Sequence, residues 1–403
     1  MPVYSIKPLL PDTTLDRFRP TPLEISAGVL FGADPASEPL PRAVAVTPHD
    51  ALRSSIRTAL NRPPCVVAFS GGRDSSAMLA LACDIARADG LPLPIPVTLR
   101  FPGVAEADET QWQETVVRHL RLDDWVRLEF DDELDYVGPW AQQVLQTHGL
   151  LWPANDYVDL PLLQQAGTGS LVDGVDGDSV FSSAYQRLVQ TLRGRRRPGR
   201  AALGDAVFLL KSQRARQRDA YAHALRLPWL TQTAQHEMSE LLAIEFAAEP
   251  FSYAKRVRWY HQSRYLGALR WTTELFAAQT GTAVVRPLVD PTFLTALAQS
   301  VGTLGFKGRT ATMRWLFGDV LPAAVIERTS KASFPHYWGK ASRLLAADWR
   351  GEGVDRRYVD HDVLREMWAN DRVDHRSALL IQSVWLARNG HAVQACSAST
   401  RST

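Results

Sequence analysis

The sequence predicts an α/β protein, in which a doubly wound parallel sheet is followed by a mainly helical C-terminal part. Short apolar runs rich in β-branched residues are typical of buried parallel strands, and helical patterns separate these runs. Strands that alternate with helices favour a parallel sheet with helices on both faces. After about residue 185 the patterns become long and helical, with few strand signals.

The elements follow in order along the chain. Residues 50–60 have the apolar spacing of a short amphipathic helix. A helix begins at residue 77, directly after the first strand and a glycine-containing turn, and two more helices are expected at residues 110–120 and 140–146. The expected strands are residues 65–69, 95–99, 125–130 and 170–172.

These patterns divide the chain into four regions. Residues 1–50 contain many prolines and little periodicity, which predicts an arm or a small cap. Residues 51–190 form the α/β domain, residues 191–395 the mainly helical part, and residues 396–403 a disordered tail. The basic Gly/Pro run at residues 193–200 fits a solvated loop, and it also fits a site for an acidic peptide or phosphate.

Composition excludes several classes of function. The chain has 403 residues, a formal net charge of +2 and three cysteines without a CxxC pair. A near-neutral balance gives no case for a nucleic-acid or membrane binder, and the cysteines indicate a reducing compartment without structural zinc. Because neither a signal peptide nor a transmembrane run is present, we expect a cytoplasmic protein.

The most informative segment is SGGRDSS at residues 70–76, between the first strand and its helix. Glycines let a backbone approach phosphate oxygens closely, and a helix N-terminus offers unpaired N–H groups to an anion. Phosphate would repel an isolated Asp74, so its expected role is to hold Mg²⁺ on a polyphosphate. The alternative is a glycine turn with an aspartate helix cap. The expected nucleotide-binding residues here are Ser70, Gly71, Gly72, Asp74, Ser75 and Ser76.

A second acidic, glycine-rich turn, LVDGVDGDSVF at residues 171–181, follows the fourth strand. Ligands of open parallel sheets bind at the carboxyl ends of the strands. The segment resembles the TGEGxDELF turn of the asparagine synthetases, and the resemblance implies that Asp178 shares the metal with Asp74 and that Gly174 approaches the nucleotide. An ordinary Asp/Gly turn is the alternative.

Together these motifs resemble the PP-loop ATP pyrophosphatases, whose signature is SGGxDS, and among them the asparagine synthetases, whose second turn reads TGEGxDELF. The resemblance extends over residues 55–340 and includes the β-lactam synthetases and lasso-peptide cyclases. It implies a PP-loop (HUP-like) fold that binds ATP and Mg²⁺. It further implies that Leu99, near the end of the second strand, contacts adenine through its backbone.

Later segments continue the resemblance. Residues 285–290 are similar to the family's RxPFLD, and residues 321–334 to its LPxxVxxRxK…F. The resemblance implies that Lys331 stabilises charge on the reacting phosphate, as a cation near developing negative charge should. Lys307 lies seven residues before Arg314, as in the family's K-to-LR spacing, and is a second candidate.

The chain also departs from this family. Residue 2 is Pro where glutamine-dependent members have a catalytic Cys, so glutamine hydrolysis is not expected. Val175 stands where asparagine synthetases have a proton-accepting Glu, and Asp173 and Asp176 are its nearest replacements in the sequence. We assign Asp176 as the catalytic candidate. These differences argue against asparagine as the product.

The resulting hypothesis is an AMP-forming amide synthetase that activates a carboxylate, which could belong to a peptide, and transfers it to an amine. Peptide amidation or macrocyclisation is a specific case, with a partner protein or a homo-oligomer possible. Alternatives are a PP-loop tRNA-modifying enzyme and a nucleotide-binding regulator without catalysis. The aromatic residues of the helical part are interpreted mainly as core; they include Trp259, Tyr260, Tyr265 and Trp271.

Overall fold

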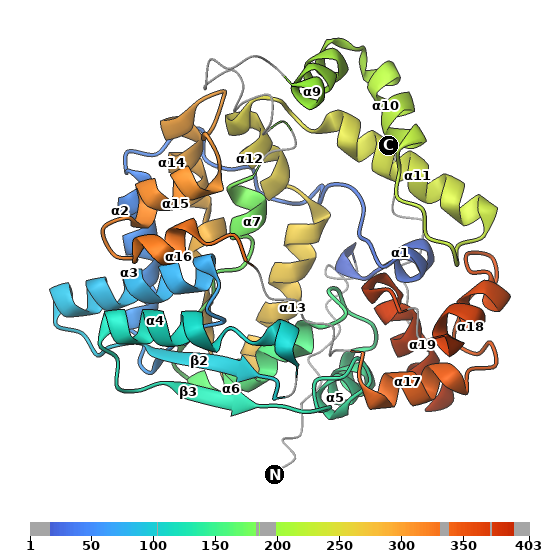
Figure 1. Cartoon of the computed structure of the whole chain (residues 1–403), viewed down its shortest axis with the longest axis horizontal. Coiled ribbons are helices and arrows are strands. Elements are labelled where there is room, and N and C mark those ends of the chain that lie inside the picture. Colours follow the sequence, from blue (N-terminus) through green and yellow to red (C-terminus); the bar gives the residue numbers. More distant parts are fainter. Residues whose placement is uncertain are drawn as a thin grey trace.

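A computed structural model describes residues 17–102, 104–182, 185, 199–330, 338–370 and 373–390 (Figure 1). At its centre is a five-stranded sheet in the order β3-β2-β1-β4-β5, and every neighbouring pair of strands is parallel. The strands are β1 (Cys65–Ala68), β2 (Ile95–Arg100), β3 (Val126–Glu129), β4 (Ser170–Val172) and β5 (Ala283–Val285). The predicted parallel α/β fold is confirmed.

β5 was not predicted, and it lies within residues 191–395, the region expected to be mainly helical. It has only three residues, each half-buried, so it lacks the alternation that identifies a strand in a sequence. Its position depends on pairing with β4, where Leu171 is in register with Val284. The sheet therefore crosses the predicted boundary at residue 190.

Helices cover both faces of the sheet because neighbouring residues of a strand point to opposite faces. Val67 belongs to one apolar core, and Val66 belongs to another on the opposite face. Helices of the first core include α2 (Pro48–Leu60), α3 (Arg73–Asp89), α4 (Thr110–Leu120), α12 (Tyr253–His261), α14 (Pro291–Val301), α15 (Arg309–Phe317) and α16 (Ala323–Glu327). Those of the second include α5 (Pro139–His148), α6 (Leu160–Ala166) and α13 (Arg264–Thr280).

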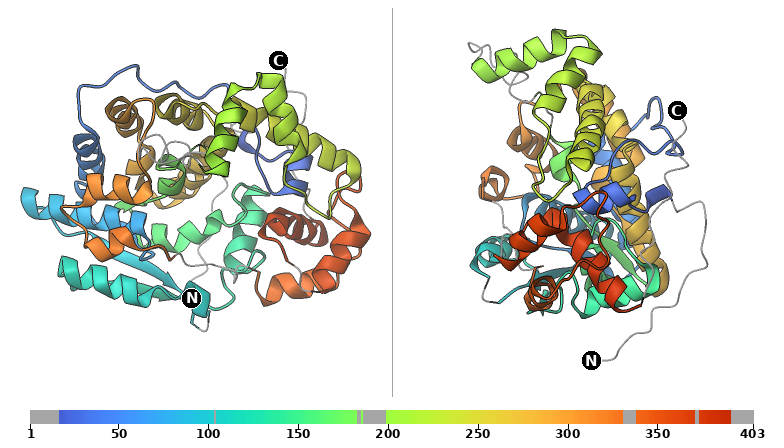
Figure 2. Two further views of the ribbon diagram at one scale, coloured as in Figure 1. Left: turned by 45° about the horizontal axis from the view of Figure 1, so that its top comes forward. Right: turned by 90° about the vertical axis from the view of Figure 1, so that its right-hand side faces the viewer.

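A third apolar core lies beside the sheet and is built from helices and the loops that connect them (Figure 2). Trp229 and Trp349 are both fully buried in it. Its helices include α1 (Pro22–Ala27), α11 (Gln232–Ala248), α17 (Lys340–Ala347), α18 (His361–Ala369) and α19 (Ala378–Arg388). The other described elements are α7 (Gly177–Val180), α9 (Arg200–Leu210), α10 (Gln213–Ala222) and the 3₁₀ turns η2 (Ala105–Ala107), η3 (Asp156–Asp159), η4 (Pro287–Val289) and η6 (His375–Ser377).

The described part of the N-terminal region is held firmly to the rest of the molecule. Glu24 in α1 is fully buried and pairs with Arg264 at the start of α13. The same carboxylate accepts hydrogen bonds from the backbone N–H groups of Thr21 and Phe31, at 2.8 and 3.1 Å. Because a buried charge needs partners for its oxygens, these contacts fix the arm onto α13.

Candidate active site

The candidate site lies at the carboxyl ends of β1 and β4, where the order of the sheet reverses direction. Such a switch point opens a crevice in doubly wound sheets. A cavity of about 780 Å³ opens there, lined by both acidic turns. The predicted residues that line it are Ser70, Gly72, Asp74, Ser75, Leu99, Gly174, Asp176 and Asp178.

The turn between β1 and α3 has the backbone of an anion-binding loop. Gly71 has φ of +84°, which disfavours any residue with a Cβ. Gly72 is the N-cap of α3 without a side-chain cap, so the first N–H groups of the helix stay available to a ligand. The hydroxyl groups of Ser70 and Ser75 lie 3.0 Å apart. Ser76 is fully buried, so its side chain lies in the core and not in the cavity lining.

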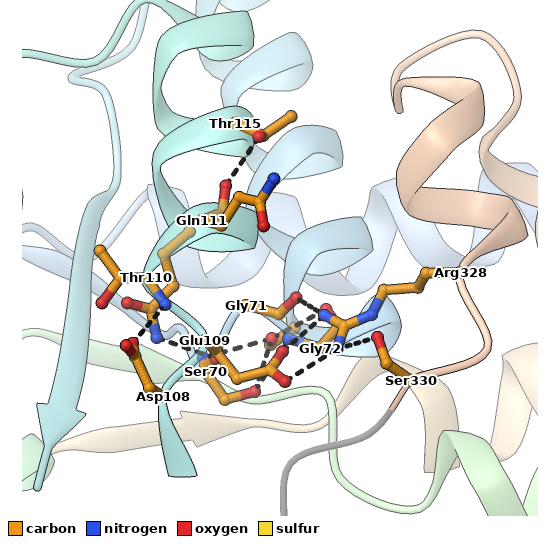
Figure 3. Close-up of polar contacts among 12 residues, drawn as sticks. Ser70, Gly71, Gly72, Asp108, Glu109, Thr110, Gln111, Thr115, Arg328 and Ser330 are labelled. Atoms are coloured by element: carbon orange, nitrogen blue, oxygen red, sulfur yellow. Dashed lines mark hydrogen bonds and ion pairs between the residues drawn. The ribbon is translucent and has the colours of Figure 1, made fainter. Parts of the chain in front are cut away.

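Two side chains hold the carbonyl groups of this loop, and Figure 3 shows one of them, Arg328, beside Gly71 and Glu109. Arg328 donates a hydrogen bond of 2.8 Å to the Gly71 carbonyl and pairs with Glu109 at 2.5 Å. Gln113 donates one of 3.0 Å to the Ser70 carbonyl. The C=O and N–H groups of one planar trans peptide unit point in opposite directions. Carbonyl groups that are held on one side of the loop therefore direct the adjoining N–H groups to its other side. The sequence did not identify these supports, because neither belongs to the glycine segment itself.

The two acidic turns meet closely. A Cβ on Gly174 would lie 2.8 Å from the backbone carbon of Asp74, and one on Gly177 would lie 2.4 Å from its Cγ. Arg309, the first residue of α15, bridges the two carboxylates. Its Nη2 lies 2.5 Å from Asp74 Oδ2, and its Nη1 contacts Asp178 Oδ1. The structure thus brings together the two predicted metal ligands.

The donor set at this position fits Mg²⁺. Carboxylate oxygens are the ligands that this hard cation prefers, usually completed by water and substrate phosphates. Asp74 Oδ1 is buried and has no hydrogen-bond partner, as expected for an atom that accepts a ligand. Among the described residues no group of three or more His, Cys, Asp or Glu could hold a metal alone. A metal here would therefore need the nucleotide phosphates as further ligands.

Asp176 lies in the cavity wall, on the second acidic turn. Its backbone is left-handed, with φ of +67°, a conformation that aspartate tolerates better than most residues. Its Oδ1 accepts a hydrogen bond of 3.3 Å from the Tyr265 hydroxyl. Burial raises the pKa of Asp176. Tyr265 was interpreted as core but lines the cavity, whereas Tyr260 and Trp271 are buried.

Behind Asp176, an arginine neutralises part of an acidic cluster. Arg286 pairs with Asp173 at 2.8 Å and with Asp159 at 3.7 Å. Burial lowers the pKa of Arg286, but the surrounding aspartates outweigh burial and raise it. Burial also raises the pKa of Asp159. Asp173, a possible replacement for the missing Glu, is thus engaged with Arg286, and Asp176 remains the better-placed carboxylate.

The two predicted lysines have different outcomes. Lys307 is exposed and is missing from the described residues that line the cavity, whereas Arg309, two residues later, lines it. Lys331 lies outside the described residues, since residues 331–337 are not among them. Arg309 was missed because the K-to-LR spacing directed attention to Lys307. Its position at the start of a helix in the same segment was the available signal.

Comparison with known families agrees with this geometry. The family model for asparagine synthase matches residues 49–387, which is most of the chain. The chain belongs to the asparagine synthase family. Membership makes it an ATP-dependent, amide-forming synthetase in general terms, and members of the asparagine synthase family use ATP, usually with Mg²⁺. Among curated proteins, none matches the chain. Within the described residues, every helix is too short or too polar to cross a membrane.

Proposed function

We propose that this protein forms an amide bond in two steps, by adenylating a substrate carboxylate and then transferring the acyl group to an amine. In the first step a carboxylate oxygen attacks the α-phosphorus of ATP and pyrophosphate leaves. In the second step the amine nitrogen attacks the acyl carbon and AMP leaves. The observation that carries this proposal is the meeting of the glycine loop, Asp74 and Asp178 at one cavity.

Arginine side chains line the cavity beside the glycine loop. Arg73, Arg309 and Arg328 all line it, beside the N-terminus of α3. Burial lowers the pKa of Arg73, and the neighbouring charge of Arg309 lowers it further. Guanidinium groups pair well with phosphate oxygens. Mg²⁺, when bound by Asp74 and Asp178, would neutralise phosphate charge and orient the leaving pyrophosphate.

Asp176 is our candidate proton acceptor for the amine. Val175 packs against the apolar core and has no group that exchanges protons. Asp176, the next residue, lines the same cavity and has a pKa raised by burial, which makes its carboxylate a stronger base. The attacking amine would lose its proton to this carboxylate, and the hydrogen bond from Tyr265 would orient it.

The absence of the family's Glu at residue 175 supports an amine other than ammonia, carried by a peptide or another natural product. Amidation or macrocyclisation of such a substrate is the specific reaction that we propose. Its substrates would be a carboxylate and an amine, and the amine could belong to the same molecule or to a partner.

The test is ATP–pyrophosphate exchange, measured against a panel of carboxylates that includes peptides. With the true substrate, Asp74→Ala should lower exchange about a hundredfold or more, since it removes a ligand of the metal that stabilises the reacting phosphates. Lys331→Ala should also lower it. Asp84→Ala is the matched control, because Asp84 lies on the same helix and pairs with Arg53 at the surface. Undiminished exchange in Asp74→Ala would contradict the assignment.

A further inference from the structure

Arg309 stands where a metal ion would stand between the two acidic turns. Its guanidinium contacts Asp74 and Asp178 at once, and its side chain is only 18% exposed. The Nη2 to Asp74 Oδ2 distance is 2.5 Å. Mg²⁺ binds carboxylate oxygens at about 2.0–2.1 Å. The ion and the guanidinium cannot occupy this position together.

We propose that Arg309 is an internal counter-cation, which holds the metal-binding carboxylates in the nucleotide-free protein and is displaced when metal and nucleotide bind together. The proposal rests on the proposed function, because it takes Asp74 and Asp178 as the metal ligands. Without Arg309, two carboxylates would face each other without the cation that now lies between them, which is costly in a partly buried site. The arginine removes that cost until the metal arrives.

Displacement by metal alone is unfavourable, because a divalent cation must break both ion pairs and leave a guanidinium close beside it. Nucleotide changes this balance, since its phosphates offer the displaced guanidinium a new anionic partner. Metal and nucleotide should therefore bind with positive coupling. The protein would select the metal–nucleotide complex over free metal.

The local structure allows such a movement. Arg309 begins α15 and follows Gly308, whose φ of 148° few other residues adopt. Its Nε is buried without a hydrogen-bond partner, and its two terminal nitrogens contact the two aspartates. The alternative role, in which Arg309 permanently holds the two carboxylates in place, leads to the opposite prediction. If Arg309 shaped the metal site permanently, removing it would separate the carboxylates and weaken metal binding.

The experiment titrates Mn²⁺ into the nucleotide-free protein and follows the free ion by electron paramagnetic resonance. Arg309→Gln should bind Mn²⁺ about tenfold or more tighter than the wild type, because a repelling cation has been removed. Arg309→Lys keeps the positive charge but loses the planar guanidinium that contacts both carboxylates. Its Mn²⁺ affinity should lie between those of the wild type and Arg309→Gln. Arg314→Gln is the matched control, since Arg314 lies on the same helix and pairs with Glu327 at the surface.

A second titration adds α,β-methylene-ATP, which cannot be cleaved between the α and β phosphates. The analogue should raise the Mn²⁺ affinity of the wild type more than that of Arg309→Gln, and Asp74→Asn should abolish the gain. Suppose that Arg309→Gln binds Mn²⁺ no more tightly than the wild type, while Mn²⁺ binding is still lost in Asp74→Asn. This result overturns the counter-cation role of Arg309 but keeps the metal site. If Mn²⁺ binding does not depend on Asp74, either with or without the analogue, the metal site and the counter-cation role are both overturned. Circular dichroism confirms that each variant is folded.

Discussion

Arg328 shows how much one buried side chain contributes to the nucleotide loop. It is 5% exposed, pairs with Glu109, donates to the Gly71 carbonyl, and lies 4.6 Å from the centre of the Trp112 ring. Charge-assisted bonds of this kind are stronger than neutral ones. Removing one partner of a buried pair leaves the other charge uncompensated. Arg328 therefore joins α16 and α4 to the loop.

Arg328→Ala should lower the free energy of unfolding by about 3–5 kcal/mol, because the buried Glu109 carboxylate would lose its cationic partner. The apparent affinity for ATP should also fall, since the Gly71 carbonyl loses its donor. Arg328→Lys should recover part of the stability but little of the affinity, because a lysine cannot reproduce the fork. Denaturant unfolding and nucleotide titration provide the two measurements.

Arg350→Ala is a suitable control, because Arg350 is 73% exposed in its pair with Asp348. Exposed pairs contribute roughly 0–1 kcal/mol. If Arg328→Ala changed stability no more than this control, Arg328 would not support the loop as described.

At the scale of elements, the site depends on a close approach between α7 and the start of α3. Gly177 is the first residue of α7, and a Cβ there would lie 2.4 Å from Cγ of Asp74. A methyl group at this position would push α7 away from α3 or turn the Asp74 side chain. Either change would separate the two predicted metal ligands.

Gly177→Ala should therefore weaken binding of metal with nucleotide by about tenfold or more, since a shift of about 1 Å at a site is costly. Gly204→Ala is the matched substitution, because Gly204 lies within α9 with no atom within 4 Å of the added Cβ. It should raise stability by about 0.5–1 kcal/mol and leave binding unchanged. Equal nucleotide affinity in both variants would show that the close approach is unimportant.

The same scale shows what the sequence could predict. The strands β1, β2, β3 and β4 were expected within one or two residues. β1, β2 and β4 are mainly apolar, and β3 alternates apolar with charged residues. Helix α4 has the predicted bounds of residues 110–120. β5 was missed, because three half-buried residues carry no periodic signal and tertiary pairing alone makes them a strand.

At the scale of the whole molecule, the candidate site joins segments that are far apart in the chain. The glycine loop was predictable because it follows an apolar strand and precedes a helix, and Asp178 because the second acidic turn resembles the corresponding segment of the asparagine synthetases. The position of Arg309 in the site was not predictable, because its contact with Asp74 spans 235 residues and depends on how α15 packs. Tyr265 was likewise interpreted as core, because its cavity-facing position depends on the orientation of α13.

The third core connects the N-terminal arm with the rest of the molecule. The N-terminal arm contributes Leu23 and Ile25 to it, and the buried pair of Glu24 with Arg264 connects it to α13. The prediction of an arm or a small cap understated this connection, because a proline-rich segment without periodicity gives no indication of what it packs against. The arm stabilises the helix that carries Tyr265.

The central claim is that Asp74 and Asp178 hold one metal ion on one nucleotide, and a double-mutant cycle tests it most directly. The affinity for Mn²⁺ with α,β-methylene-ATP would be measured for Asp74→Asn, Asp178→Asn and the double variant. Each single change should weaken binding by about tenfold to a hundredfold, and the double variant should be little weaker than the weaker single, since ligands of one ion are coupled. Losses that simply multiply would show that the two carboxylates act independently and would contradict the claim.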